Sequence, residues 1–440
     1  MTKGKLNEMI KVLWVCNTFT LDVAVKKCIP APTLGGWLTG LSNSLKKVSE
    51  IALVYCYPAV GNKKQDDFII EGIHYYSFYS PKLYGLLNIE SDKDVPLKRN
   101  QIADILEKEN PDLVHIFGTE YVHSLIVAQE AKRRNIEILC SIQGLISVCQ
   151  ERYLDYIPYE YWHKLNVSCA FRGTLYGQMK KMSKRSNNEI ATLKICNHII
   201  GRTEWDRVHT YFINKKRSYY FCNETLRDEF YIHEWDYSSC KKHSIFISQG
   251  SSPIKGLSNV LLAISLLRDE FENIELYIAG NDFVSDTSFT SKIKRSTYAD
   301  YILRLIKRFH LQNCVHFTGA LDANKMVEYY LRSNVFISPS TIENSSNSLG
   351  EAMLLGVPVI ASNVGGTSSI LSDSAEGFLY EGKDVCFLAD LIKLVFLNED
   401  DTIIEMAKRG RRKAQMMFDK KSNQERLVTI YKDIINEKSE

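Results

Sequence analysis

The chain has 440 residues, of which 45% are hydrophobic, and this length exceeds what one hydrophobic core usually supports, so we expect two domains. Its 55 basic and 52 acidic residues leave a net charge of +3, which argues against nucleic acid or an acidic polymer as a partner. The sequence contains no run of about 18 uninterrupted apolar residues, which excludes a membrane-spanning helix.

Short β-rich apolar runs alternate with helical patterns along the whole chain, which predicts an α/β protein with parallel sheets built from βαβ units. A helix is expected directly after Gly35-Gly36, because Trp37, Leu41 and Leu45 recur on one helical face. In the first half the strands are expected at Ile10–Cys16, Ile51–Tyr57, Ile73–Phe78, Leu113–Phe117, Ile136–Ile142, His198–Gly201 and Tyr219–Cys222.

A second series of runs begins near residue 244, after the polar stretch Glu234–His243, which is the best candidate for a linker. We therefore expect domains at residues 1–238 and 239–412, with an amphipathic helix in 413–440 that packs back toward the first domain. The strands of the second series are expected at Ser244–Ser248, Ile274–Ala279, Val315–Thr318, Val335–Ser338, Pro358–Ser362 and Gly377–Tyr380.

The most informative motif is a strand, loop and helix from Ser338 to Ser362, in which Glu343 lies in the loop and Glu351 follows eight residues later. Open α/β sheets place ligands at the carboxyl ends of their strands, so both carboxylates can face one crevice. The free amides and positive end of a helix beginning near Ser348 suit a diphosphate. Alternatively, Ser348 and Glu351 form a capping box that only completes the helix terminus.

Two further loops follow the first strand of each series. In the second series, Gly250 allows close approach of the backbone, and Lys255 precedes a helix at a point where its ammonium group can reach a phosphate. In the first series, Gly35-Gly36 lets backbone amides approach a ligand. The G-x-G-x-x-G spacing is missing, which makes a nicotinamide-dependent dehydrogenase unlikely. Alternatively, Lys255 is a solvated lysine at the start of a helix, and Gly35-Gly36 is a structural turn.

These residues resemble glycosyltransferase family 4, the retaining enzymes of the GT-B fold, in which two Rossmann-like parallel-sheet domains face a central cleft. The resemblance rests on Glu343 and Glu351, on Gly365-Gly366 and, more weakly, on Gly35-Gly36 and Lys255-Gly256. It implies a nucleoside-diphosphate sugar as donor, bound mainly by the second domain, and an acceptor bound by the first domain.

The resemblance also implies the role of each residue. Glu343 and Lys255 would be catalytic, with Lys255 on the diphosphate, Glu343 near the transferred sugar and Glu351 on the ribose. No cofactor and no metal are expected, because a lysine and helix amides replace the metal ion and no Asp-x-Asp motif ends a strand. The remaining donor-binding residues are expected to be Gly35, Gly36, Gln143, Gly250, Asn344, Ser345, Ser346, Asn347, Ser348 and Leu349.

The sequence departs from the family pattern at three places. Gly250 stands where many relatives have an arginine, and either Arg202 or Lys325 could replace that charge. Gln143 stands where a histidine is common, and an amide can position a sugar but cannot carry a proton near neutral pH. Thr367-Ser368-Ser369 follows the second glycine pair and lacks a familiar carboxylate.

Candidates for the acceptor site lie in the first half. His115 and Glu120 end one strand and both can touch an acceptor, although His115 within an apolar run is more often a satisfied buried histidine. The aromatic segment Glu151–Trp162 and the basic cluster Lys180–Arg185 suit a glycan or a lipid head group. Alternatively, the aromatic residues form an ordinary stripe of the hydrophobic core and the basic residues form a solvated helix face, and this interpretation is at least as well supported.

The eleven scattered cysteines and the absence of a signal peptide predict a cytoplasmic protein, with peripheral contact to the inner face of the membrane. We expect a hexosyltransferase that acts on a glycan or lipid-linked glycan in the synthesis of a bacterial surface or capsular polysaccharide. The alternatives are a nucleotide-sugar 2-epimerase and a non-catalytic partner protein that has lost its site.

Overall fold

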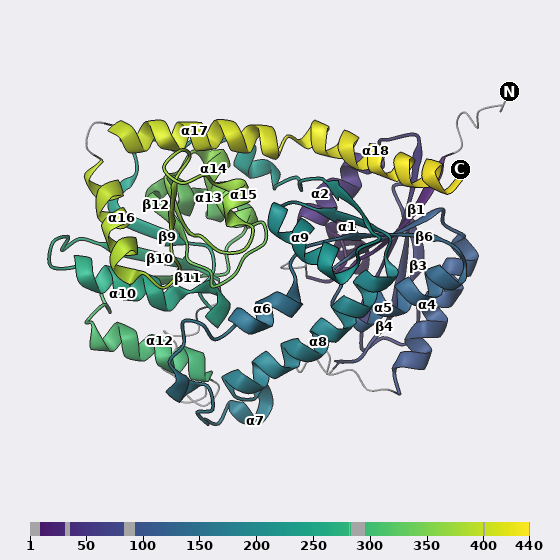
Figure 1. Ribbon diagram of the computed structural model, residues 1–440, viewed down its shortest axis with the longest axis horizontal. Helices are drawn as coiled ribbons and strands as arrows, with labels where there is room; N and C mark the ends of the chain where they lie inside the picture. Colours follow the sequence, from purple (N-terminus) through teal and green to yellow (C-terminus); the bar gives the residue numbers. More distant parts are fainter. Residues whose placement is uncertain are drawn as a thin grey trace. The chain divides into compact units, whose positions relative to one another are not determined.

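The computed structural model describes residues 9–30, 36–82, 93–280, 282, 295–398 and 401–439 (Figure 1). The chain forms two compact units, one from residues 1–147, 183–225 and 419–440 and the other from residues 148–182 and 226–418. Each unit is built around its own sheet, as the alternation of strand and helix patterns predicts.

The first unit contains an eight-stranded sheet in the order β3-β4-β2-β1-β5-β6-β7-β8, in which only the edge strand β3 is antiparallel to its neighbour. Its strands are β1 Ile10–Val15, β2 Ile51–Val60, β3 Asp67–Ile70, β4 Ile73–Ser80, β5 Leu113–Phe117, β6 Glu137–Ser141, β7 His198–Gly201 and β8 Ser218–Phe221. Its helices are α1 Leu21–Lys27, α2 Gly36–Leu45, α4 Val95–Glu109, α5 Val122–Arg133, α9 Glu204–Ile213 and α18 Lys420–Ser439, while α6 Ile146–Arg152 and α8 Leu175–Ile195 contribute residues to both units.

The second unit contains a six-stranded, fully parallel sheet in the order β11-β10-β9-β12-β13-β14. Its strands are β9 Lys241–Ile247, β10 Glu275–Ala279, β11 Val315–Gly319, β12 Ser333–Ser338, β13 Val359–Ser362 and β14 Phe378–Tyr380. Its helices are η1 Tyr159–Tyr161, α7 Cys169–Arg172, η2 Asp228–Tyr231, η3 Pro253–Lys255, α10 Leu257–Leu267, α12 Thr297–Arg308, α13 Ala323–Arg332, α14 Asn347–Leu355, α15 Thr367–Ile370, α16 Val385–Leu397 and α17 Thr402–Met417.

The limits of the units differ from the expected boundary at residue 238. The chain enters the second unit at Leu226, because η2 packs against α13 and α14. Residues 148–182 also belong to the second unit, since Tyr153, Leu154 and Tyr161 lie in a core with residues of α10 and α12. The boundary expected from the sequence would put this segment in the first domain.

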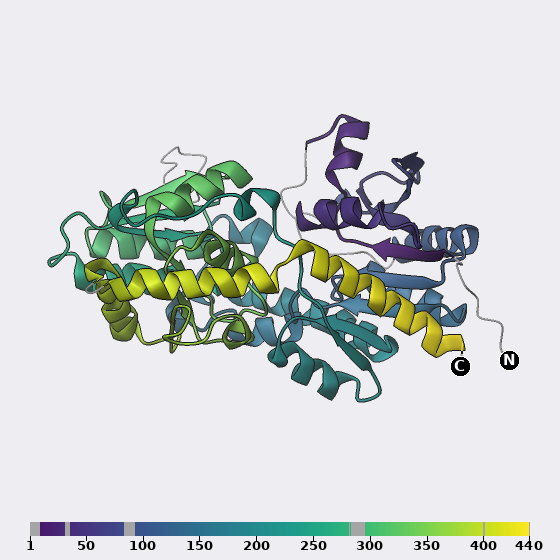
Figure 2. The ribbon, with the colours of Figure 1, turned by 90° about the horizontal axis from the view of Figure 1, so that it is seen from above.

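The two final helices belong to different units although they follow one another in the chain (Figure 2). Ala414 of α17 and the adjoining Phe418 are buried in the second unit. Three residues of α18, Leu427, Ile430 and Ile434, lie in the core of the first unit beside strand residues such as Trp14. The last 22 residues, 419–440, therefore complete the first unit rather than forming an appendage.

Candidate functional site

The carboxyl edge of the second sheet brings the loops after β9 and β12 together. β9 lies between β10 and β12, so the strand order reverses there, and open parallel sheets bind ligands at such a point. Gly256 has a positive φ of 67°, and a β-carbon at this position would overlap the carbonyl oxygen of Pro339. The amide of Thr341 donates to the carbonyl of Ile254 at 2.8 Å. A glycine is therefore required for the two loops to meet.

The meeting of these loops joins the two residues predicted to be catalytic. Lys255 Nζ lies 2.9 Å from Glu343 Oε2, and the hydroxyl of Ser340 donates to the same oxygen at 3.2 Å. The Glu343 carboxylate raises the pKa of Lys255, so the ammonium form persists. The two side chains are 31% and 20% exposed, which leaves both within reach of a ligand.

A cavity of about 80 Å³ adjoins this ion pair. It is lined by polar groups from both loops and from the start of α14, which are Ser248, Gln249, Lys255, Ser338, Ser340, Glu343, Ser346 and Ser348. Lys255 is the sole basic residue in this lining. An ammonium group, several hydroxyls and a helix N-terminus together suit a polyanionic group with hydroxyl-bearing neighbours.

The second glycine pair, Gly365-Gly366, packs against the main chain of Glu343. Gly365 has a φ of 55°, and a β-carbon there would overlap the carbonyl oxygen of Glu343. That oxygen also accepts a hydrogen bond from the Gly366 amide at 2.9 Å. The pair Gly365-Gly366 thus fixes the backbone on which Glu343 stands.

Helix α14 begins at Asn347, with Ser346 as its N-cap, since the Ser346 hydroxyl accepts from the Leu349 amide at 3.3 Å. The capping box of Ser348 and Glu351 is therefore absent. Leu349 is fully buried in the core, so only its backbone can contact a ligand. The side chains of Asn344 and Ser345 are buried as well.

Glu351 is held by an arginine that no motif indicated. Nε and Nη2 of Arg227 both donate to Glu351 Oε1, at 3.0 Å and 2.8 Å. Burial raises the pKa of the Glu351 carboxyl to about 7, and the guanidinium of Arg227 opposes this rise. Arg227 lies in the irregular segment that leads into η2, where the sequence offers neither periodicity nor a motif.

The structure explains the glycine at position 250. A β-carbon there would lie 2.8 Å from a methyl group of Ile278 and 3.0 Å from one of Leu257, so a longer side chain would require these two side chains to shift. Of the two suggested replacements for the missing arginine, Lys325 is exposed and does not line the cavity. Arg202 belongs to the first unit, where its guanidinium lies 3.1 Å from Glu224.

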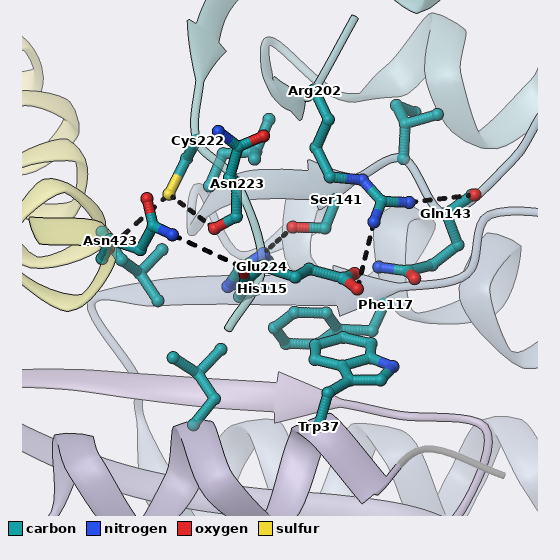
Figure 3. Close-up of a pocket in the computed structure, with 14 residues that line it drawn as sticks. Trp37, His115, Phe117, Ser141, Gln143, Arg202, Cys222, Asn223, Glu224 and Asn423 are labelled. Atoms are coloured by element: carbon teal, nitrogen blue, oxygen red, sulfur yellow. Dashed lines mark hydrogen bonds and ion pairs between the residues drawn. The ribbon is translucent and has the colours of Figure 1, made fainter. Parts of the chain in front are cut away.

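A second pocket lies in the first unit, where strands β5 to β8 end and α2 and α18 cover them (Figure 3). Arg202 extends to the Glu224 carboxylate and, at 3.3 Å, to the main-chain oxygen of Gln143. The side chains of Arg202 and Glu224 are 4% and 8% exposed. Trp37 and Phe117 form an aromatic wall below them. The pocket measures about 30 Å³ and combines an aromatic surface with charged and amide groups.

His115 also lines this pocket, but both of its ring nitrogens already have partners. Nδ1 lies 2.7 Å from the Tyr431 hydroxyl and Nε2 lies 2.7 Å from that of Ser141. Burial lowers the pKa of His115 to about 3, so the ring is neutral. Of the two interpretations of His115, this geometry favours a buried, fully hydrogen-bonded histidine over an acceptor contact.

Among the other predicted residues of the first unit, Gln143 lines this pocket as well. Glu120 accepts a hydrogen bond from Arg185 at 2.7 Å and does not line it. Gly36 is the first residue of α2, and Gly35 lies outside the described residues. No sequence motif indicates Glu189, whose carboxylate accepts hydrogen bonds from the amides of Ile146 and Ser147 at 2.8 Å and 3.0 Å. These bonds hold the start of α6, directly after the Gln143 loop.

The aromatic segment is divided between the core and the surface of the second unit. Tyr153 and Tyr161 belong to the core of the second unit, whereas Tyr159, Leu165 and Val167 in and after this segment are exposed. The cluster Lys180–Arg185 lies within α8. No helix in the described part of the chain is long and apolar enough to cross a membrane. The same residues contain no cluster of three or more histidine, cysteine, aspartate or glutamate side chains that could hold a metal.

Part of the chain is similar to known proteins. Residues 236–416 match the model of glycosyl transferases group 1. Protein CapJ of Staphylococcus aureus is 27% identical over 189 residues, which are 42% of this chain and 43% of CapJ. The aligned part thus covers less than half of that relative.

Two solved structures share the fold over nearly the whole chain. Sucrose-phosphate synthase from Thermosynechococcus elongatus superposes with a TM-score of 0.69 at 15% identity, covering 97% of this chain and 99% of that one. HepE from Anabaena, solved in complex with UDP-glucose, gives a TM-score of 0.63 at 15% identity, with 98% and 99% covered. The fold class is GT-B, as the resemblance implies, with two parallel-sheet α/β units.

Proposed function

We propose that this chain, whose residues 236–416 match the model of glycosyl transferases group 1, transfers a hexose-type sugar from a nucleoside-diphosphate sugar with retention of configuration. The observation that carries the proposal is the pair formed by Lys255 and Glu343 at 2.9 Å, beside the N-terminus of α14 and at the strand-order reversal of the second sheet. The UDP-glucose complex of HepE supports a uridine diphosphate sugar as the first donor to test.

In this proposal the donor diphosphate lies against Lys255 and the amides at the start of α14. The negative charge of the diphosphate displaces Glu343 from Lys255, and Glu343 then accepts hydrogen bonds from hydroxyls of the sugar. Glu351, fixed by Arg227, accepts hydrogen bonds from the ribose. The backbone of residues 344–349 and the small residue Gly250 allow the donor to approach closely.

The transfer step forms a bond between an acceptor hydroxyl oxygen and the anomeric carbon, and it breaks the bond from that carbon to the diphosphate oxygen. The bonding electron pair leaves with the nucleoside diphosphate, and the proton of the acceptor hydroxyl passes to a phosphate oxygen. Lys255 and the helix amides stabilise the charge that develops on the leaving group. We propose that this charge stabilisation makes a resident metal ion and a cofactor unnecessary.

We assign the acceptor to the first unit, where the pocket of Trp37, Phe117, Arg202 and Glu224 offers an aromatic face and charged groups to a sugar. The proposed acceptor is a glycan or lipid-linked glycan of a bacterial surface or capsular polysaccharide, an assignment supported by the similarity to CapJ. The eleven cysteines, none of which forms a disulfide, support a cytoplasmic location, and a lipid-linked acceptor would place the protein at the inner face of the membrane.

The test is hydrolysis of a panel of nucleotide sugars by the purified protein in EDTA, with release of nucleoside diphosphate as the signal. We expect slow hydrolysis of one donor in preference to the others, unchanged by EDTA. Hydrolysis that requires added metal would disprove metal independence. If no donor is hydrolysed and calorimetry detects no donor binding, the transferase proposal fails in favour of a non-catalytic partner protein.

A further inference from the structure

Helix α9 of the first unit exposes an unusual row of apolar side chains. Trp205, Val208 and Phe212 follow one another at helical spacing, and we call them the α9 stripe. Val208 is 38% exposed, Phe212 is 72% exposed and the neighbouring Tyr211 is 43% exposed. Trp205 is half-buried, and its ring centre lies 4.6 Å from that of His209. A stripe of this spacing normally faces the core, so its exposure on α9 requires an explanation.

Buried polar bonds on the opposite face fix the helix in this orientation. Asp206 is fully buried and accepts hydrogen bonds from the Arg202 amide at 2.9 Å and from the Tyr219 hydroxyl at 2.6 Å. Thr210 is also fully buried and accepts from Arg217 Nε at 3.0 Å. Turning α9 to bury the stripe would break these bonds and bury unpaired polar groups, which is costly. These buried hydrogen bonds therefore keep the stripe facing outward.

Basic residues border the stripe. Lys215 and Lys216 follow α9 directly, both are exposed, and neither has an ion-pair partner among the residues that the structure describes. The guanidinium of Arg217 lies 5.9 Å from the Tyr211 ring centre and 5.0 Å from that of Tyr219. Glu204, the exposed acidic residue on α9, is paired with Arg207. The stripe thus has a positively charged margin.

We propose that the α9 stripe, with Lys215 and Lys216, binds the surface of an anionic lipid bilayer. Tryptophan and tyrosine favour the interface between water and hydrocarbon, phenylalanine and valine enter the acyl region, and lysines bind anionic head groups. Membrane binding by the α9 stripe would bring the first unit to a lipid-linked acceptor, and in this respect the inference rests on the proposed function.

The test is flotation of the full chain with vesicles of 70% phosphatidylcholine and 30% phosphatidylglycerol, compared with vesicles of phosphatidylcholine alone, compositions chosen to give roughly the anionic content that recruits basic amphipathic helices. We expect wild type to float with the anionic vesicles, and Val208→Ser with Phe212→Ser to lower the bound fraction at least about fivefold. Lys215→Glu with Lys216→Glu should lower it to a similar degree. Sodium chloride should weaken wild-type binding.

The matched control is Leu165→Ser, which changes an apolar residue that is 78% exposed in the second unit, beside the aromatic segment first considered for membrane contact. It should float as wild type. Wild type that stays unbound, serine variants that still float, or loss of binding in Leu165→Ser would each overturn the proposal. So would sedimentation showing a wild-type dimer that the serine variants dissolve, since the stripe would then join two copies. Unchanged unfolding midpoints verify that the variants fold, and flotation requires no sugar transfer, so a failure of the transferase proposal is detected separately.

Discussion

Lys255 and Glu343 lie 88 positions apart in the sequence and touch only because β9 and β12 are neighbours in the sheet. Both residues were predicted from their motifs, since each follows a strand and precedes a helix. Their direct ion pair was not predicted, because it depends on the order of strands. The ion pair means that the free protein keeps Lys255 charged and positioned before a donor arrives.

We predict that Lys255→Ala lowers donor turnover at least about tenfold, which corresponds to roughly 1.4 kcal/mol of transition-state stabilisation. The variant loses the cation that opposes charge on the leaving diphosphate. Lys325→Ala is the matched control, because Lys325 is exposed outside the cavity lining and should turn over donor as wild type does. Steady-state release of nucleoside diphosphate measures both. A loss in Lys325→Ala equal to that in Lys255→Ala would show that the diphosphate lies elsewhere.

The pairing of Arg227 with Glu351 could not be predicted from the sequence. The two glutamates carry a recognisable spacing, but Arg227 lies 124 positions before its partner Glu351, in a segment without a pattern. Only the packing of η2 against α14 brings them together. The absence of an arginine at position 250 is a second example. Ile278 and Leu257 crowd this position only in the folded protein, so the sequence does not reveal the crowding.

Among the elements, the strands were the most predictable. β5 and β7 have the bounds expected from sequence, because each is a short apolar run enclosed by polar residues. The edge strand β3 was missed. Its signal was the turn Glu71-Gly72, in which both residues have positive φ and connect β3 to β4 as a two-residue hairpin. The hydrophobic pattern of β3 is weak because the strand is half exposed.

The start of α6 depends on Glu189, a buried carboxylate that lies in α8. Burial raises the pKa of Glu189 to about 7, against the hydrogen bonds from Ser147 and Ile146. Because the folded-state pKa lies above the unfolded value, the folded protein binds the proton more tightly. The contribution of Glu189 to stability is therefore fully present below about pH 4.5 and is lost as pH rises to about 7.

We predict that Glu189→Gln reduces this dependence on pH, since glutamine resembles the protonated acid and cannot ionise. The difference in unfolding free energy between variant and wild type should change in favour of the variant by roughly 2 kcal/mol between pH 5 and pH 8. Urea denaturation at both pH values measures it. Comparison with wild type cancels the contribution of Glu351, which titrates in the same range. A constant difference between the two proteins would show that Glu189 keeps an ordinary pKa.

At the scale of the whole molecule, two sheets and a returning terminal helix were expected, and the assignment of residues 148–182 to the second unit was not. The apolar pattern of that segment is compatible with either core, so only tertiary packing decides between them. The terminal helix was more predictable, because an amphipathic pattern at the end of a chain must bury its apolar face against something.

The final prediction concerns which unit the terminal helix stabilises. Ile430 is fully buried in the core of the first unit, so Ile430→Ala should cost about 2–5 kcal/mol of stability there. We expect hydrogen exchange, followed by mass spectrometry, to accelerate in peptides of residues 9–147 and 183–225 and to stay unchanged in residues 226–418. Met416→Ala on α17 is the control, because Met416 is 74% exposed and its removal leaves no cavity. Faster exchange in the second unit of Ile430→Ala would mean that the terminal helix stabilises both units, and the division of the chain between two cores would then need to be redrawn.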